Sequence, residues 1–270
     1  MNDIFQQKDP SFLSVPLWEK YNPSLVVGFT TRFGGYSQSP YDTFNFGLHV
    51  NDHHQDILAN RNKLGESLGI PLNYWVAAEQ THGIHTHVVD KHDKGKGAHT
   101  FGTSIKDTDG LITKETGILC TAFFADCVPL YFYDPITSYI GIAHAGWKGT
   151  TNKIGLKMVE RLQNLGVNPE NLLAVIGPSI SQEEYEVDER VVNHIDEIYR
   201  ENVTIKLNQN KYLLDLKRLN QEILLSSGLK ESNIEMTKHC TYKEENLFFS
   251  HRRDQGTTGR MLGYIGLMQT

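Results

Sequence analysis

Short apolar runs separated by turns dominate the middle of the chain, and this pattern predicts buried strands. Between residues 119 and 149 one run ends at Cys127, a second spans residues 128–133 and a third spans 139–143. A near-continuous apolar sequence is typical of strands buried on both faces of a sheet. The connection Asp-Pro-Ile-Thr after the second run is too short for a crossover helix, so we expect the last two runs to form an antiparallel hairpin.

The flanking segments predict helices alternating with further strands. Apolar residues recur at helical spacing in residues 52–68, 150–165, 188–200 and 216–226. Shorter apolar runs predict strands in residues 24–30, 74–79, 84–89, 111–113, 172–176, 212–214 and 233–237, and an apolar tail covers 261–268. Asp52 is expected to cap the first helix and Gly69 to end it. The pattern favours a mixed α/β fold with a mixed, partly antiparallel sheet.

No linker, repeat or low-complexity tract interrupts the chain, so we expect a single domain over residues 1–270. Pro10 and Pro16 break any regular pattern near the start. Residues 1–23 are therefore expected to be an irregular N-terminal stretch.

Composition and charge narrow the class of protein. The chain is 39% hydrophobic and 21% charged, with a formal net charge of −6, and so lacks the basic surface typical of nucleic-acid binding. Neither a signal peptide nor an apolar run of about 18 residues is visible, which predicts a cytoplasmic protein without membrane contact. Three cysteines in such a chain argue against a disulfide framework, and Cys120, inside an apolar run, is expected to fill the core.

Three side chains suited to metal binding follow predicted strands: His82, Cys127 and His144. Imidazole and thiolate are zinc ligands, and three protein ligands leave a position for water or substrate. Their separations are too long to match a structural zinc finger, so chemistry alone leaves alternatives open. The same set suits copper, a metal-free Cys–His nucleophile pair, or a buried thiol with satisfied histidines.

Polar residues near this set are further candidates. Asp126 could carry a proton or support the ligands, although it is adjacent to Cys127 and neighbours on a strand point to opposite sides. Arg32, beside a Gly-Gly pair, could help to cradle an anion, or the pair could be an ordinary turn. Arg61 lies on the inward face of the helix over 52–68 and is either a structural ion-pair partner or a ligand clamp.

The motifs that contain these residues closely resemble the YfiH-like family, whose members have been labelled polyphenol oxidases or laccases and purine nucleoside phosphorylases. The match runs in one order from about residue 24 to the end of the chain, and Ala-Asp-Cys followed by Ala-His-Ala-Gly-Trp is its most specific part. The matching residues are Thr31-Arg32, Gly34-Gly35, Ser37, Asn45, Gly47, Asn60-Arg61, Gln80, His82-Gly83, Asp109-Gly110, Ala125-Asp126-Cys127, Pro129, Ala143 to Gly149, Gly177-Pro178, Ile180, Cys240-Thr241, Phe248-Phe249-Ser250, Arg252-Arg253 and Gly259-Arg260.

The resemblance implies a single-domain, layered α-β sandwich related to the deamidase domain of cytotoxic necrotizing factor toxins. It implies one zinc ion on His82, Cys127 and His144, and a nucleoside pocket lined by Asn45, Arg61 and Gln80. His251 stands where the family usually has tyrosine.

The implied reaction is phosphorolysis of adenosine, inosine, guanosine and methylthioadenosine, accompanied by adenosine deaminase activity. Phosphate is then a co-substrate that Arg32, Arg61 or Lys148 could hold. The partners would be a purine nucleoside and phosphate, and the protein a monomer or small homo-oligomer. Alternatives are a copper polyphenol oxidase and a metal-free Cys–His hydrolase or deamidase. Only His85-Thr86-His87 has the His-x-His form expected of multicopper sites.

Overall fold

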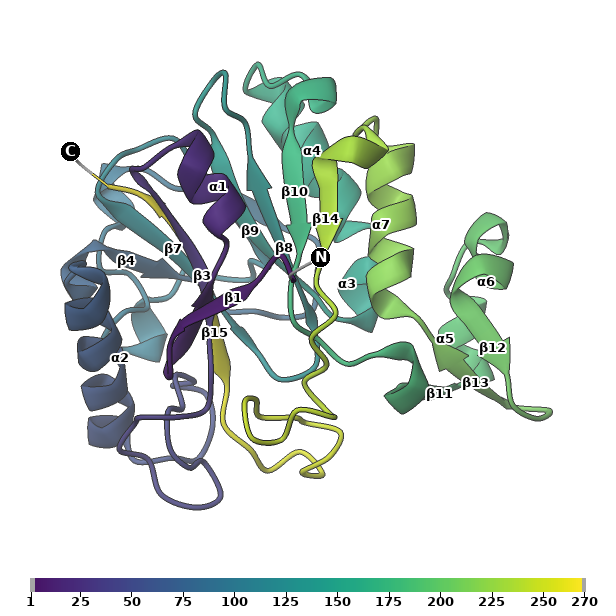
Figure 1. Cartoon of the computed structure of the whole chain (residues 1–270), viewed down its shortest axis with the longest axis horizontal. Coiled ribbons are helices and arrows are strands. Elements are labelled where there is room, and N and C mark those ends of the chain that lie inside the picture. The colour runs from purple at the N-terminus through teal and green to yellow at the C-terminus, as the bar shows by residue number, and fades with distance from the viewer. Residues whose placement is uncertain (1–2, 269–270) are drawn as a thin grey trace.

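The computed structural model describes residues 3–268 and stacks two six-stranded sheets between layers of helices (Figure 1). The first sheet has the order β1 (Gln6–Asp9), β2 (Phe12–Ser14), β3 (Leu25–Thr30), β15 (Met261–Leu267), β7 (Ile118–Phe124), β4 (Trp75–Ala77). The second has the order β14 (Ile234–Met236), β10 (Leu173–Ile176), β8 (Val128–Tyr133), β9 (Ile140–Ala145), β6 (Gly110–Thr113), β5 (Thr86–Val88). Both sheets combine parallel and antiparallel pairs, which confirms the predicted mixed α/β class.

The β8–β9 hairpin is antiparallel as predicted, and its side chains alternate between two cores. Leu130 and Phe132 of β8 pack toward the helices, whereas Tyr131 and Tyr133 pack toward the first sheet. Every residue of β8 is therefore buried, which is why its sequence is apolar throughout. Cys120 of β7 lies in the core between the sheets, as predicted.

Helices cover the outer face of each sheet (Figure 1). α4 (Ile154–Asn164) and α7 (Leu216–Ser226) pack on the second sheet through residues such as Met158 and Leu224. α2 (His54–Leu68) packs on the first sheet through Leu64. The remaining helices are α1 (Pro16–Tyr21), α3 (Trp147–Thr151), α5 (Glu189–Asn193) and α6 (Glu197–Val203). No helix among the described residues is long and apolar enough to cross a membrane.

The N-terminal stretch is regular, so the prediction of an irregular segment over residues 1–23 is wrong for the part that the structure describes. β1 and β2 form a hairpin on the edge of the first sheet, and α1 follows. Pro16 occupies the start of α1, where a missing N–H costs nothing, and Trp18 is buried. Proline therefore starts this helix instead of breaking it.

Three helix predictions need local correction. α2 begins at His54 after an N-cap at His53, because the Asp52 carboxylate accepts a hydrogen bond from Asn45 instead of capping the helix. Residues 150–165 divide into the end of α3 and α4 at Lys153, whose φ is 68°. Residues 188–200 divide into α5 and the start of α6.

α5 and α6 lie in the chain between strands of a small third sheet. Its order is β11 (Glu186–Asp188), β13 (Lys211–Leu214), β12 (Thr204–Lys206). Figure 1 shows this part projecting beyond α7. Its edge strands are short and half polar, which explains why their hydrophobic pattern does not predict them.

Candidate functional site

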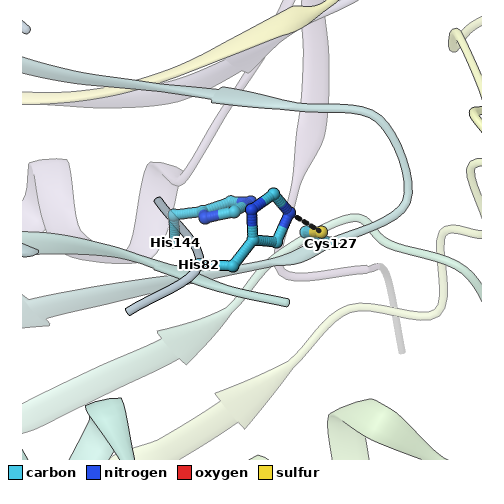
Figure 2. Close-up of side chains that lie close together, drawn as sticks. All are labelled: His82, Cys127 and His144. Carbon is cyan, nitrogen blue, oxygen red and sulfur yellow. Dashed lines mark hydrogen bonds between the residues drawn. The ribbon is translucent and has the colours of Figure 1, made fainter. Parts of the chain in front are cut away.

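The three predicted ligands come together where separate segments of the two sheets converge. His144 lies on β9, Cys127 occupies the turn between β7 and β8, and His82 lies in the loop after β4. One donor atom from each lies within 4.8 Å of the other two, and Cys127 Sγ is 4.0 Å from His82 Nε2 (Figure 2). The two imidazole rings stand edge to face with centroids 4.7 Å apart. Folding thus converts long separations in sequence into one cluster.

The cluster fits a metal ion in donor chemistry and size. Bonds of about 2.0–2.3 Å in a tetrahedral site place neighbouring ligand atoms roughly 3.3–3.8 Å apart. The 4.0 Å between Cys127 Sγ and His82 Nε2 is slightly longer, so a small inward movement of the side chains would bring them to bonding distance. Gly146 keeps this space open: a Cβ there would lie 2.8 Å from His82 Cδ2 and 3.0 Å from Cys127 Sγ. Within residues 3–268 no other group of three His, Cys, Asp or Glu side chains is arranged in this way. The donor set fits zinc and copper equally.

The charges within the cluster favour a thiolate. Burial by itself would raise the pKa of the Cys127 thiol, but the charge of His144 and hydrogen bonds from His144 and His82 outweigh it, so the pKa is lowered. Burial likewise disfavours the charged form of His144, but Cys127 and Asp109 raise its pKa above the usual value. A thiolate is the form that both a metal ligand and a nucleophile need, whereas His144 can bind a metal only through an Nε2 that has lost its proton.

Asp109 belongs to the site, although sequence reasoning treated Asp109-Gly110 only as a turn and a family motif. Its carboxylate is 2% exposed and lies 2.8 Å from His144 Nδ1. Burial would raise the pKa of Asp109, but the hydrogen bonds and the charge of His144 lower it. The available signal was its position in the turn directly before the strand predicted at residues 111–113.

The backbone at Asp126 does not have the extended strand conformation that the sequence predicts. Its φ is 83°, so the chain bends here, and both Asp126 and Cys127 line the same cavity. Its carboxylate accepts hydrogen bonds from Thr241 Oγ1, Ser250 Oγ and the Arg252 N–H, at 2.7, 3.0 and 2.7 Å. These contacts favour support of the pocket wall over proton transfer.

The cluster opens into a cavity of about 560 Å³. Its walls combine aromatic rings with cationic side chains. The aromatic members are Phe101, Phe123, Trp147 and Tyr185; the cationic ones are Lys148, Arg252 and Arg260; His49 and His251 also line the cavity. A ligand with a flat ring and negative charge matches this lining.

Two of the five residues predicted to bind substrate line the cavity, Gln80 and Lys148. Gln80 has its amide committed to the backbone of Phe123, which it contacts through both Nε2 and Oε1 at 2.9 and 2.7 Å. Gln80 therefore fixes the Phe123 wall. Lys148 extends over the Trp147 ring, with Nζ 5.7 Å from the centroid.

Arg61 is not among the cavity-lining residues. It is 1% exposed, and its guanidinium donates to the carbonyl oxygens of Phe46, Gly97 and Ala98. The guanidinium also lies over the Phe123 ring, 4.9 Å from the centroid. These contacts favour a structural role for Arg61 over a ligand clamp. Its partners are backbone carbonyl oxygens, however, and not the carboxylates of an ion pair.

Arg32 and Asn45 also lie outside the lining. The Arg32 side chain donates to Asp42 and to the carbonyl oxygen of Glu245. Asn45 is fully buried, and its Oδ1 accepts the N–H of Arg260 at 2.8 Å. Asn45 therefore positions a cavity residue without facing the cavity.

Sequence reasoning missed several cavity residues. Arg252 and Arg260 stand in quoted family motifs without an assigned role, which was the available signal. Tyr185, which lies 5.1 Å under the Arg252 guanidinium, had no signal, because it reaches the cavity from the projecting part of the chain. His49 is open to the cavity, and burial, with Arg260 and Arg61 nearby, lowers its pKa to about 4.

Known proteins that resemble this chain in sequence match it over nearly their whole length. Residues 26–268 match the family described as multi-copper polyphenol oxidoreductase laccase. A Bacillus subtilis (strain 168) protein named purine nucleoside phosphorylase YlmD is 43% identical over 98% of both chains. A Staphylococcus epidermidis protein named purine nucleoside phosphorylase is 37% identical over 90% of this chain and 91% of its own.

Two solved structures share the whole architecture. The crystal structure of YlmD from Geobacillus stearothermophilus has a TM-score of 0.94 at 41% identity, covering 99% of this chain and all of that one. That of the hypothetical protein YfiH from Bacillus licheniformis has a TM-score of 0.95 at 41% identity, covering 98% of this chain and 100% of that one. The predicted fold class is confirmed by both.

Proposed function

This chain belongs to the family described as multi-copper polyphenol oxidoreductase laccase, as the resemblance to YfiH-like proteins predicted, and we propose that it is a purine nucleoside phosphorylase. The observation that carries the proposal is one cavity in which the His82, Cys127 and His144 cluster faces cationic and aromatic side chains. Relatives named for this activity support it.

The cavity supplies what phosphorolysis requires. The reaction joins a phosphate anion to C1′ of the ribose while the purine leaves with the electrons of the glycosidic bond. Lys148, Arg252 and Arg260 are the cationic groups available for phosphate. Arg252 and Arg260 are already oriented, because each donates from one guanidinium nitrogen to backbone carbonyls and keeps further N–H groups.

The aromatic walls suit the other substrate. Phe123 and Tyr185 offer flat apolar surfaces on which a purine can stack. Phe123 is held by Gln80 and Arg61, and Tyr185 by the Arg252 guanidinium. Holding both reactants in one enclosed site lowers the entropic part of the barrier.

The finer proposal is one zinc ion on His82, Cys127 and His144, with guanosine, inosine, adenosine and methylthioadenosine as substrates and adenosine deamination as a second activity. Zinc, when bound, lowers the pKa of water to about 7 and so supplies the hydroxide that deamination needs. Cys127, His82 and His144 would hold the ion. Lys148 and Arg32 remain proposed phosphate groups, with Arg32 the weaker because its donors are occupied within the protein.

Chromatography of inosine or adenosine incubated with the protein, with and without phosphate, tests the activity. We expect release of free base and ribose 1-phosphate only when phosphate is present, and loss of at least 100-fold in rate for Cys127→Ala. Cys240→Ala is the matched control, since Cys240 is buried outside the cavity lining. Phosphate-independent or absent base release by the wild-type protein contradicts the proposal.

Copper-dependent phenol oxidation is the second candidate, favoured by the family description. The His85–His87 pair gives it little support, because Nδ1 of His85 contacts Asp107 and Nε2 of His87 contacts Asp93, each at about the length of a normal hydrogen bond. Metal analysis of protein purified without affinity resin separates the candidates: several coppers per chain with phenol oxidation and no base release would replace our proposal.

A further inference from the structure

Main-chain hydrogen bonds alone fix the backbone of Asp109 at the junction of two strands. Its backbone N–H donates to His85 O at 3.0 Å, and its carbonyl oxygen accepts the N–H of His144 at 2.8 Å. It directly precedes β6, which pairs with β9 in antiparallel register. The position of its carboxylate relative to β9 is therefore set by sheet hydrogen bonds.

The carboxylate accepts four N–H hydrogen bonds, divided between its two oxygens. Oδ1 accepts from His144 Nδ1 at 2.8 Å and from the His82 N–H at 3.1 Å. Oδ2 accepts from the Gly83 N–H at 2.8 Å and from the Thr81 N–H at 3.1 Å. The Thr81 hydroxyl lies 3.2 Å from Oδ2 but is closer to Asp107 Oδ1, at 2.7 Å. With these donors in place, Asp109 serves the cluster as an acceptor and not as a fourth ligand.

The contact with His144 determines which ring nitrogen faces the cluster. A carboxylate oxygen can only accept a hydrogen bond, so the nitrogen that contacts it must carry the hydrogen. Nδ1 of His144 therefore bears hydrogen, and its Nε2 presents the lone pair. Because Nδ1 is engaged by Asp109, Nε2 is the nitrogen that His144 has left for the cluster with Cys127 and His82 (Figure 2). Without the contact, the ring could rotate or change tautomer.

The contact with His82 acts through the backbone. His82 has a φ of 60°, a left-handed conformation that is unfavourable for a residue other than glycine. Three successive N–H groups, from Thr81, His82 and Gly83, converge on the carboxylate and favour this conformation. It directs the His82 ring toward Cys127.

We infer that Asp109 is the positioning residue of the cluster, one buried carboxylate that orients two of the three ligands, His82 through its backbone and His144 through its ring. The inference rests on the proposed metal centre. Only a carboxylate suits the position, because an amide would turn an NH₂ group toward donors on one side or the other.

Zinc affinity of the Asp109→Asn variant, measured by competition with a chromophoric chelator, is the test. We expect a dissociation constant 10–100-fold higher than that of the wild-type protein. Asp107→Asn is the matched control, since Asp107 is on the same turn and contacts only the side chains of Thr81 and His85. Unchanged affinity in a folded Asp109→Asn variant, or an equal loss in Asp107→Asn, overturns the inference.

Cobalt spectra and nitrogen NMR supply readouts that a general structural defect would not change in the same way. The Co²⁺-loaded Asp109→Asn protein should show altered ligand-field bands while its circular dichroism matches that of the wild type. If the variant does not fold, the wild-type protein decides the matter: the nitrogen spectrum of His144 must show Nδ1 protonated in the zinc-loaded state, and the other tautomer overturns the inference. Base release by the wild-type protein is scored separately, so failure of the phosphorylase proposal is distinguishable from failure here.

Discussion

The carboxylate of Asp126 accepts the backbone N–H of Arg252 at 2.7 Å, which joins the turn between β7 and β8 to the loop before β15. The same carboxylate accepts the hydroxyl groups of Thr241 and Ser250. One side chain beside the His82, Cys127 and His144 cluster therefore holds the part of the cavity wall that carries His251 and Arg252.

Asp126→Asn should weaken substrate binding more than metal binding. The amide keeps the size of the side chain but replaces an acceptor oxygen with a donor, so at least one of the three contacts is lost. We expect the free energy of unfolding to fall by about 1–3 kcal/mol and KM to rise at least several-fold, with zinc content unchanged. Urea denaturation, steady-state kinetics and metal analysis check this; loss of zinc at an unchanged KM would contradict it.

Gly146→Ala should weaken zinc binding at the proposed metal site without unfolding the protein. The added Cβ would meet His82 Cδ2 and Cys127 Sγ at 2.8 and 3.0 Å, so the ligands must separate. Overpacking of this kind costs about 1–3 kcal/mol, which corresponds to roughly 5- to 150-fold in zinc affinity if it falls on the bound state. Gly102→Ala is the control, because its Cβ meets no atom within 4 Å. Equal zinc affinities for the two variants would show that Gly146 is not needed for space.

Arg61→Met should cause a loss of stability that distinguishes a structural arginine from a ligand clamp. The substitution leaves the carbonyl oxygens of Phe46, Gly97 and Ala98 without their buried donor. We expect a loss of about 3–5 kcal/mol in the free energy of unfolding, and a similar loss for Arg61→Lys, whose ammonium cannot span three carbonyls. Arg161→Met, on the exposed face of α4, should change stability by less than about 0.5 kcal/mol. A raised KM without a change in denaturation midpoint would favour the clamp.

Asp93 should make stability depend on pH below about 5. Burial would raise its pKa, but hydrogen bonds from Lys96 and His87 outweigh this and lower the pKa to about 2. Because the folded pKa is below the unfolded value of about 3.9, the stabilisation is complete above pH 5 and disappears as pH falls toward 2. Asp93→Asn should lower the free energy of unfolding at pH 7 by on the order of 1–2 kcal/mol, and this difference should shrink by pH 3.

Urea denaturation of both proteins at several pH values measures the effect of Asp93. Glu66→Gln, an exposed carboxylate outside the ion pairs, is the control and should show no such pH dependence. A difference that stays constant between pH 7 and pH 3 would mean that the Asp93 charge is not what stabilises the segment after β5.

The sequence determined the elements whose signal is local. Near-continuous apolar runs predicted β8 and β9 and their antiparallel pairing, because a short turn permits only that arrangement. Helical periodicity predicted α7 over residues 216–226, and the structure confirms it and adds an N-cap at Asp215. His82, Cys127 and His144 were found from the chemistry of their side chains at strand ends.

Tertiary structure decided everything that depends on contacts between distant segments. The strands divide into two sheets because each buried strand carries two apolar faces that different layers cover, and the sequence does not say which layer. Asp109 lies in the site only because β6 pairs with β9. Arg61 does not line the cavity, because its guanidinium is surrounded by three carbonyl oxygens from loops distant in sequence. Hydrogen bonds between such segments have no period or spacing in the sequence, so only folding shows which polar side chain meets which partner.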